Sequence, residues 1–217
     1  MLEIFDINYT SLSDKKSEEL FTLRKETFKD RLNWAVNCID GMEFDEYDNH
    51  NTNYLFGVKD NIVICSLRFI EMQYPNMITG TFSPYFGRFT LPEGNYIESS
   101  RFFIDKIRAR KVGCSQYPIS TLFFLAMVNY ARKFNYDGIL TIVSHPMLTI
   151  LERSGWGVSV IEQGISEKNE KVYLLHLPVD TKNQNALIER VQHAVNIEKS
   201  RLASWPLVCS LMTEKLA

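Results

Sequence analysis

The sequence predicts an α/β sandwich, in which helices pack against the faces of a sheet. Apolar stretches with the alternation of β-strands are separated by stretches with helical periodicity. The clearest helix begins at Pro118 and follows an apolar strand at 96–105. A chain of 217 residues can bury one sizeable core but is short for two ordinary domains. We therefore expect a single domain over residues 1–217, with a tail from about residue 181 whose role the sequence does not define.

The first quarter of the chain predicts one strand and one helix. Residues 3–7 alternate as a short strand, and a serine cap at Ser11 or Ser13 precedes a helix over 16–29. From 31 to 53 the pattern loses clear periodicity. Because connections of this length inside a compact domain are usually functional or disordered, we expect this segment to be one or the other.

The remaining elements follow from apolar alternation and from breaks at proline and glycine. A hairpin with arms at 54–58 and 62–70 is joined by a polar turn, and residues 106–116 form a basic connection after strand 96–105. Beyond the Pro118 helix we expect a buried strand at 138–144, a short helix at 145–153, strands at 157–162 and 171–177, and a helix across 184–200.

Charge and cysteine content exclude several classes of function. The formal net charge is −2 and the isoelectric point is near 6.1, so no global attraction toward nucleic acid is expected. No stretch approaches the roughly 18 apolar residues of a membrane span, and the N-terminus has no signal-peptide pattern. The four histidines lack metal-ligand spacing, and the four cysteines lack CxxC spacing. We expect a cytoplasmic protein that holds no metal and binds neither membrane nor nucleic acid.

Strand 96–105 carries two charges in apolar surroundings. Glu98 and Arg101 are three residues apart, and because side chains alternate along a strand, they should face opposite ways. Alternation groups Glu98 with Ser100 and Phe102, and only a bulge or twist would bring Arg101 to the same side. Charges among aromatic neighbours are costly to bury unless they are paired or used in function. The strand is therefore a candidate site, with a structural ion pair as the alternative.

Further charges lie in apolar surroundings upstream. Arg24 lies on a helix stripe between Phe21 and Phe28, either as a surface arginine with a buried stem or as a cation in an aromatic-lined cleft. Arg68 lies near the end of the apolar second hairpin arm. The aperiodic segment contains Trp34 and an acidic run, for which a solvated turn is the default interpretation. The acidic residues of the run are Glu43, Asp45, Glu46 and Asp48.

These charged and aromatic residues form one ordered pattern. It consists of Arg24, Phe28, Trp34, Asp45, Asp48, Arg68 and the run Glu98-Ser99-Ser100-Arg101-Phe102. The pattern resembles the acyl-homoserine-lactone synthases of the LuxI type, and most closely the enterobacterial members that make 3-oxo-acyl signals. The resemblance runs from Met1 to about Pro178 and weakens in the tail. It implies an N-acetyltransferase-like (GNAT-like) three-layer sandwich with a mixed sheet, and a quorum-sensing enzyme that makes an autoinducer.

The resemblance also implies a reaction. Members of this family take an acyl group from acyl carrier protein, use S-adenosylmethionine as the second substrate, and release an acyl-homoserine lactone, 5′-methylthioadenosine and free carrier protein, without a cofactor. The α-amino group of the methionine moiety is largely protonated at neutral pH and needs a base before it can attack a thioester. Glu98 is the candidate base, with Ser100 and Arg101 as the other catalytic residues.

The charges of S-adenosylmethionine suggest roles for the rest of the pattern. Its sulfonium and ammonium are cations, which suit Asp45 and Asp48. Its carboxylate needs a cation such as Arg24 or Arg68. The aromatic residues expected to pack on the adenine or the sulfonium are Phe28 and Trp34.

The acyl chain is expected between the Pro118 helix and the sheet. The resemblance implies a 3-oxo chain, because a threonine at the place of Thr141 accompanies 3-oxo-acyl substrates in this family, and family analogy gives a length of six or eight carbons. A buried hydroxyl also needs a partner. The expected pocket residues are Phe102, Leu122, Met127, Thr141 and Val143.

A basic surface is the candidate docking face for an acidic carrier protein, with an ordinary solvated face as an equal alternative. Residues 110–115 nearly fit the phosphate loop of acetyltransferases but have Ser115 at the last position. The cations expected on the face are Lys106, Arg108, Arg110, Lys111 and Arg153.

Two other functions remain open from the sequence. One is an N-acyltransferase that uses acyl carrier protein or coenzyme A with a different acceptor. The other is a non-catalytic binding module. Ser115 and the pattern that includes Trp34 favour the synthase over the first, and the presence of Glu98 argues against the second.

Overall fold

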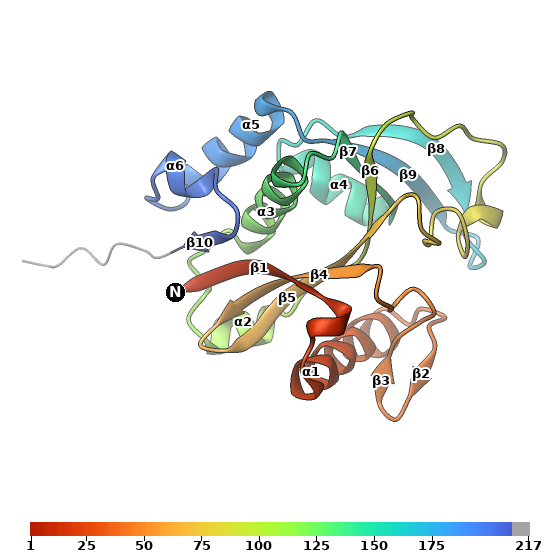
Figure 1. Ribbon diagram of the computed structural model, residues 1–217, viewed down its shortest axis with the longest axis horizontal. Helices are drawn as coiled ribbons and strands as arrows, with labels where there is room; N and C mark the ends of the chain where they lie inside the picture. Colours follow the sequence, from red (N-terminus) through yellow and green to blue (C-terminus); the bar gives the residue numbers. More distant parts are fainter. Residues whose placement is uncertain (210–217) are drawn as a thin grey trace, which may run out of the picture.

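The computed structural model describes residues 1–209 and is built on one mixed sheet (Figure 1). The spatial order of its strands is β10-β1-β4-β5-β6-β7-β9-β8, and a separate small sheet pairs β2 with β3. Among these strands, β6 and β7 pair in parallel and the other neighbours pair antiparallel. The strands are β1 (Leu2–Asn8), β2 (Cys38–Ile39), β3 (Met42–Glu43), β4 (Thr52–Lys59), β5 (Ile62–Glu71), β6 (Tyr96–Ile104), β7 (Gly138–Ser144), β8 (Ser159–Ile165), β9 (Lys171–Pro178) and β10 (Leu207–Cys209).

Helices cover both faces of the sheet, which confirms the predicted α/β sandwich (Figure 1). Helices α3, α4 and α5 pack on one face, and α1 with the π-helical turn η2 packs on the other. Within residues 1–209, no helix is long and apolar enough to cross a membrane. The helices are α1 (Asp14–Arg24), η2 (Lys25–Arg31), α2 (Lys106–Lys111), α3 (Ile119–Lys133), α4 (His145–Arg153), α5 (Thr181–Gln192) and α6 (Lys199–Leu202), with 3₁₀ turns η1 (Tyr9–Ser11) and η3 (Ser83–Tyr85).

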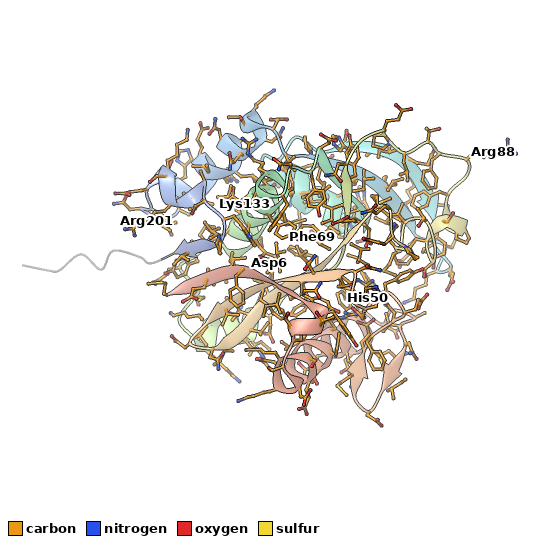
Figure 2. The ribbon with its side chains drawn as sticks, viewed as in Figure 1. Asp6, His50, Phe69, Arg88, Lys133 and Arg201 are labelled. Carbon is orange, nitrogen blue, oxygen red and sulfur yellow. The ribbon has the colours of Figure 1, made fainter. Side chains whose placement is uncertain are left out.

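The larger core lies between α3 and the sheet. Residues 122–131 of α3 are all buried, and Arg132 and Lys133 in its last turn suit the negative end of the helix dipole. Phe69 of β5 lies at the centre of the molecule (Figure 2). Its ring stacks on Tyr130 of α3 with 5.0 Å between ring centroids. A helix that is apolar all round belongs in a core, and α4, α5 and the sheet enclose this one.

The smaller core, on the opposite face of the sheet, positions the N-terminal residues of the candidate site. The helix predicted at 16–29 is divided, because α1 ends at Arg24 and continues as the π-helical turn η2. A wider turn changes the direction in which following side chains point. After η2 the backbone N–H of Trp34 donates to the carbonyl oxygen of Phe28 at 2.8 Å. This bond brings the two aromatic residues predicted for substrate binding side by side.

Two segments carry more structure than the sequence suggested. Segment 31–53 contains the β2–β3 ribbon, which is too short to show alternation. Segment 106–116 is not a plain connection, because its first part is the helix α2. The carboxylate of Asp105 accepts hydrogen bonds from the backbone N–H groups of Ile107 and Arg108, both at 2.9 Å, and so caps α2.

The later elements differ from prediction in their ends. The strand expected at 157–162 lies at Ser159–Ile165. The helix expected across 184–200 ends at Gln192. After the short helix α6 the chain returns as β10, which pairs with β1 at the edge of the sheet. The tail therefore belongs to the same sheet and core as the rest of the described chain.

The two parallel strands separate after a short pairing. Their register runs from Tyr96 opposite Gly138 to Ser99 opposite Thr141, and no pairing follows. The second half of β6 is thus free of β7, and its backbone can take a different course. Two of the three predicted catalytic residues, Ser100 and Arg101, lie in this free half, and Glu98 lies opposite Leu140 just before the strands separate.

Candidate active site

A β-bulge in β6 gathers the predicted catalytic side chains on one face of the sheet. Between its pairings opposite Ser66 and Arg68 of β5, β6 contains one residue more than its partner, and Arg101 has φ +56°. The extra residue changes the alternation. Arg101 therefore joins Glu98 on the α1 side, and Phe102 turns toward α3. The prediction that Glu98 shares its face with Phe102 and not with Arg101 is wrong for this reason.

Three arginines and three carboxylates form one buried ion network on that face. The cost of removing these charges from water is offset because each charged side chain has partners of the opposite sign. Within residues 1–209, no group of three or more His, Cys, Asp or Glu side chains is placed to hold a metal ion. The members of the network are Arg24, Arg68, Arg101, Glu43, Asp45 and Asp48.

Arg24 holds one end of the ion network. Its Nε donates to Glu43 Oε2 at 2.6 Å, and its Nη1 and Nη2 donate to the two oxygens of Asp48 at 2.7 and 2.9 Å. The Tyr54 hydroxyl donates to the same carboxylate at 2.6 Å. Burial alone would raise the pKa of Asp48, but Arg24 and Arg68 hold it well below its ordinary value. Arg24 is a buried part of the site, and the interpretation of a surface arginine is excluded.

Arg68 and Arg101 share Asp45. Arg68 Nη1 and Nη2 donate to the oxygens of Asp45 at 2.5 and 3.2 Å, and Arg101 Nη2 donates to Asp45 Oδ2 at 2.8 Å. Arg101 Nε donates to Glu43 Oε1 at 3.0 Å, so that Glu43 also joins Arg101 to Arg24. The acidic run is therefore not a solvated turn. Three of its four carboxylates, Glu43, Asp45 and Asp48, form the negative half of the network, whereas Glu46 is exposed.

Glu98 lies at the edge of the network and is 1% exposed. Its Oε2 accepts from the Ser100 hydroxyl at 3.3 Å, and Ser100 Oγ accepts from Arg68 Nε at 3.1 Å. Burial raises the pKa of Glu98 to about 7, because Arg68, Ser100 and Arg101 offset only part of the lost hydration. A carboxyl that titrates near neutral pH is matched to the work of a general base.

Two aromatic rings lie beside the network. Phe28 and Trp34 stack with 5.0 Å between ring centroids, and the Arg101 guanidinium carbon is 5.7 Å from the Phe28 centroid. Phe28 is buried, whereas Trp34 is 38% exposed. The buried Phe28 ring holds the Trp34 indole in position by stacking. The exposed part of the indole is available to a flat or cationic ligand.

Two members of the site were missed by sequence reasoning. Glu43 was included in the acidic run but given no role, although it contacts two arginines. Tyr54 was assigned only to a strand, although the hairpin register places it opposite Arg68. That register was the available signal for Tyr54. Glu43 offered no signal of its own, because its contacts depend on the fold of the β2–β3 ribbon.

The predicted acyl-chain residues lie in one apolar cluster between α3 and the sheet. Phe102 stacks on Phe124 of α3 with 5.5 Å between ring centroids. The Thr141 hydroxyl donates to the carbonyl oxygen of Ser99 at 2.8 Å, so its hydrogen already has a partner. The other predicted residues in this region, all buried, are Leu122, Met127 and Val143.

The predicted docking cations occur on two helices. Lys106, Arg110 and Lys111 are exposed on α2, which contacts β5. Arg108 is held by Glu19 through a 2.6 Å bond between Nη1 and Oε1. Arg153 lies at the end of α4, which contacts β7 and β9. Figure 1 shows α2 and α4 apart from each other.

Comparisons with known proteins identify the family. Residues 8–187 match the autoinducer synthase family model. The chain is 67% identical over 207 residues to an acyl-homoserine-lactone synthase of Pectobacterium carotovorum subsp. carotovorum, covering 95% of this chain and 96% of that relative. The solved structure of the AHL synthase LasI has a TM-score of 0.73 at 24% identity, covering 92% of this chain and 98% of that one. The CoA-dependent acyl-homoserine lactone synthase BjaI, with SAM and isopentyl-CoA, has a TM-score of 0.76 at 19% identity, covering 88% of this chain and 90% of that one.

These matches confirm the LuxI-type resemblance and the GNAT-like fold. They span nearly all of the described chain, including the ion network and Glu98. The chain belongs to the autoinducer synthase family and is an acyltransferase, an acyl-homoserine-lactone synthase.

Proposed function

We propose that this synthase joins a 3-oxo-acyl group from acyl carrier protein to S-adenosylmethionine in the cytoplasm. The product is N-(3-oxohexanoyl)- or N-(3-oxooctanoyl)-L-homoserine lactone, released with 5′-methylthioadenosine and free carrier protein. The observation that carries this proposal is Glu98, a buried carboxyl with a pKa of about 7 beside the point where β6 and β7 separate. A neighbour in fold, BjaI, holds SAM and isopentyl-CoA, which supports S-adenosylmethionine as the amine substrate.

Glu98 starts the acyl transfer in this proposal. It takes a proton from the substrate ammonium, directly or through a water, and the free amine attacks the thioester carbonyl. The new C–N bond replaces the C–S bond, and the carrier thiolate leaves and receives a proton. A carboxyl with pKa of about 7 is half ionised at neutral pH and therefore accepts this proton readily.

Lactone formation needs no nucleophilic side chain. A carboxylate oxygen of the methionine moiety attacks the carbon bonded to sulfur, the C–S bond breaks, and its electron pair neutralises the sulfonium. Because attacking and leaving groups belong to one molecule, positioning supplies most of what the step requires. Phe28 and Trp34 supply that positioning through the adenosine side of the substrate.

The exposure of the network members suggests which of them meet the substrate. Asp45 and Asp48 each pair with two arginines, but the Asp48 side chain is 1% exposed and the Asp45 side chain is 11% exposed. Arg101 is likewise more accessible than Arg24. We therefore assign the cationic groups of the substrate to Asp45 and its carboxylate to Arg101. Asp48, Arg24 and Arg68 then fix the positions of those two side chains.

The test of the proposal is product identification. Purified protein is incubated with S-adenosylmethionine and a series of acyl carrier proteins and acyl-CoAs, each with and without a 3-oxo group. Mass spectrometry should detect a six- or eight-carbon 3-oxo lactone from the carrier-linked donors. Absence of lactone from every donor contradicts the proposal as a whole. Lactone from acyl-CoA alone contradicts the choice of donor.

Replacing Thr141 with valine should reduce the preference for 3-oxo over unsubstituted chains about fivefold, which corresponds to one hydrogen bond of about 1 kcal/mol. A substrate 3-oxo group would accept the hydroxyl hydrogen that Ser99 now accepts. Valine keeps the shape and removes the donor. The measurement is the ratio of kcat/KM for 3-oxo and unsubstituted acyl chains of equal length. An unchanged ratio would show that Thr141 does not select the 3-oxo group.

A further inference from the structure

We infer that Met77, in the segment between β5 and β6, is a positioning residue whose thioether holds the Nη1 group of Arg101 and is displaced from it by the carboxylate of S-adenosylmethionine. The inference rests on the proposed function, in which that carboxylate is assigned to Arg101. Met77 lies outside the pattern of charged and aromatic residues found in the sequence.

One side-chain nitrogen of Arg101 has a weak partner. Arg101 Nε donates to Glu43 at 3.0 Å and Nη2 donates to Asp45 at 2.8 Å, whereas Nη1 donates to Met77 Sδ at 3.3 Å. A thioether sulfur is an uncharged and weak acceptor. All three side-chain nitrogens of Arg24, by contrast, donate to carboxylates. Arg101 therefore keeps one donor that a stronger acceptor can take over.

The charge of Arg101 is also the least well compensated of the three arginines. Burial acts to lower the pKa of Arg24 and of Arg68, but neighbouring carboxylates raise both above the ordinary value. Burial and the like charge of Arg24 lower the pKa of Arg101, because Glu43 and Asp45 offset only part of their effect. A buried cation in this situation is stabilised by a further anion, and a substrate carboxylate supplies one.

The backbone at Met77 is fixed, whereas its side chain can move. The preceding residue, Asn76, is fully buried, and its Oδ1 accepts from the backbone N–H groups of Ile78 and Thr79, both at 3.1 Å. These bonds hold the turn that carries Met77. The methionine side chain is unbranched and has three rotatable bonds, so it can leave Nη1 without any change in the turn.

The same turn is anchored to the acidic segment of the site. The Tyr47 hydroxyl accepts from the backbone N–H of Thr81 at 3.2 Å, and the Arg68 guanidinium carbon is 5.6 Å from the centroid of the Tyr47 ring. A Cβ atom at Gly80 would lie 2.2 Å from that hydroxyl oxygen, so the close approach of the turn requires glycine. The turn therefore holds Met77 at a defined place beside the ion network.

A thioether suits this place better than a stronger acceptor or none. A carboxylate or an amide at position 77 would compete with the substrate for Nη1 of Arg101. A side chain without an acceptor would leave a buried donor unpaired in the enzyme without substrate, which lowers its stability. The affinity for S-adenosylmethionine should therefore fall as the acceptor at position 77 becomes stronger.

Binding of two matched ligands tests the inference by calorimetry. They are S-adenosylmethionine and its decarboxylated form, which keeps the sulfonium, the ammonium and the adenosine. Met77→Gln has a similar length and should raise the Kd for S-adenosylmethionine roughly tenfold, because its amide oxygen must be displaced from Arg101. Met77→Leu has no acceptor and should lower this Kd about twofold. The Kd for the decarboxylated ligand should be the same in all three proteins.

Met72→Gln is the matched control. It makes the same change at the start of the same segment, where the side chain packs against the apolar cluster of Leu140 and Leu174. It should leave the Kd of both ligands unchanged. In turnover with an acyl donor, Met77→Gln should raise the KM for S-adenosylmethionine and change kcat much less.

Three results would overturn the inference. In the first, Met77→Gln binds S-adenosylmethionine as the wild type does. In the second, it loses affinity for both ligands equally, which marks a general disturbance of the site. In the third, the wild type binds both ligands equally, which contradicts the assignment of the carboxylate to Arg101. Failure of the proposed function as a whole would instead appear as a wild type that makes no lactone from any donor.

Discussion

Replacing Glu98 with glutamine is expected to lower the rate of acyl transfer by roughly 10²–10⁴-fold, the range that general base catalysis contributes. Glutamine keeps the shape of the side chain and can still accept from Ser100, but it cannot accept the proton of the substrate ammonium. The KM for each substrate should change much less than kcat. Single-turnover kinetics with carrier-linked substrate measure the rate of acyl transfer directly. A rate within threefold of the wild type would show that Glu98 is not the general base.

The same substitution should stabilise the protein at alkaline pH. The pKa of Glu98 rises from 4.5 to about 7 on folding, chiefly through burial. Below pH 4.5 the carboxyl is protonated in both states, and the substitution has little effect through this group. As pH rises from 4.5 to 7, the Glu98 carboxyl ionises in the unfolded state before it ionises in the folded state. The free energy of unfolding of the wild type therefore falls by about 3 kcal/mol, a loss that the glutamine variant does not show. Urea unfolding of both proteins at pH 4.5 and pH 8 measures this, and a pH-independent difference would contradict the raised pKa.

Replacing Glu43 with glutamine is expected to lower the free energy of unfolding by about 3 to 5 kcal/mol. Glu43 is fully buried between Arg24 and Arg101, with bonds of 2.6 and 3.0 Å. Without its charge the network holds more positive than negative charge, and the two guanidiniums lose their common partner. The variant should also lose activity, because Arg101 is no longer held.

The control for Glu43 is Glu26→Gln in η2, which is exposed and should change the unfolding free energy by no more than about 0.5 kcal/mol. Urea titrations of both variants give the comparison. Equal stability of the Glu43 and Glu26 variants would show that the carboxylate does not hold the network together.

The residues that gather at the candidate site were more predictable from the sequence than their geometry. Arg24 and Arg68 were candidates because a charge among apolar residues is costly to bury unless it is paired. Trp34 was noted in the aperiodic segment that follows the first helix. Their joint order then pointed to the family. Alternation, however, assumes a regular strand, and the bulge at Arg101 carries no sequence signal because arginine is not a residue that favours positive φ. The face of every side chain after Ser100 was therefore assigned wrongly.

Contacts between distant segments also escaped prediction. The default interpretation of the acidic run was a solvated turn, because nothing local shows that the β2–β3 ribbon folds onto α1. The tail was unclear for the same reason, since β10 forms only by pairing with β1 at the other end of the chain. Elements with strong local periodicity, such as α3 and β7, were placed correctly because their buried apolar residues follow one another closely along the sequence.

The pH dependence of acyl transfer tests the role of Glu98 most directly. The ammonium of the substrate also titrates, near pH 8 for an ordinary α-amino group, so the profile of the wild type must be compared with that of Glu98→Gln. The kcat/KM of the wild type should rise with pH with an inflection near 7, and this inflection should be absent from the variant. An identical inflection in both proteins would contradict this expectation, because the titrating group would then not be Glu98.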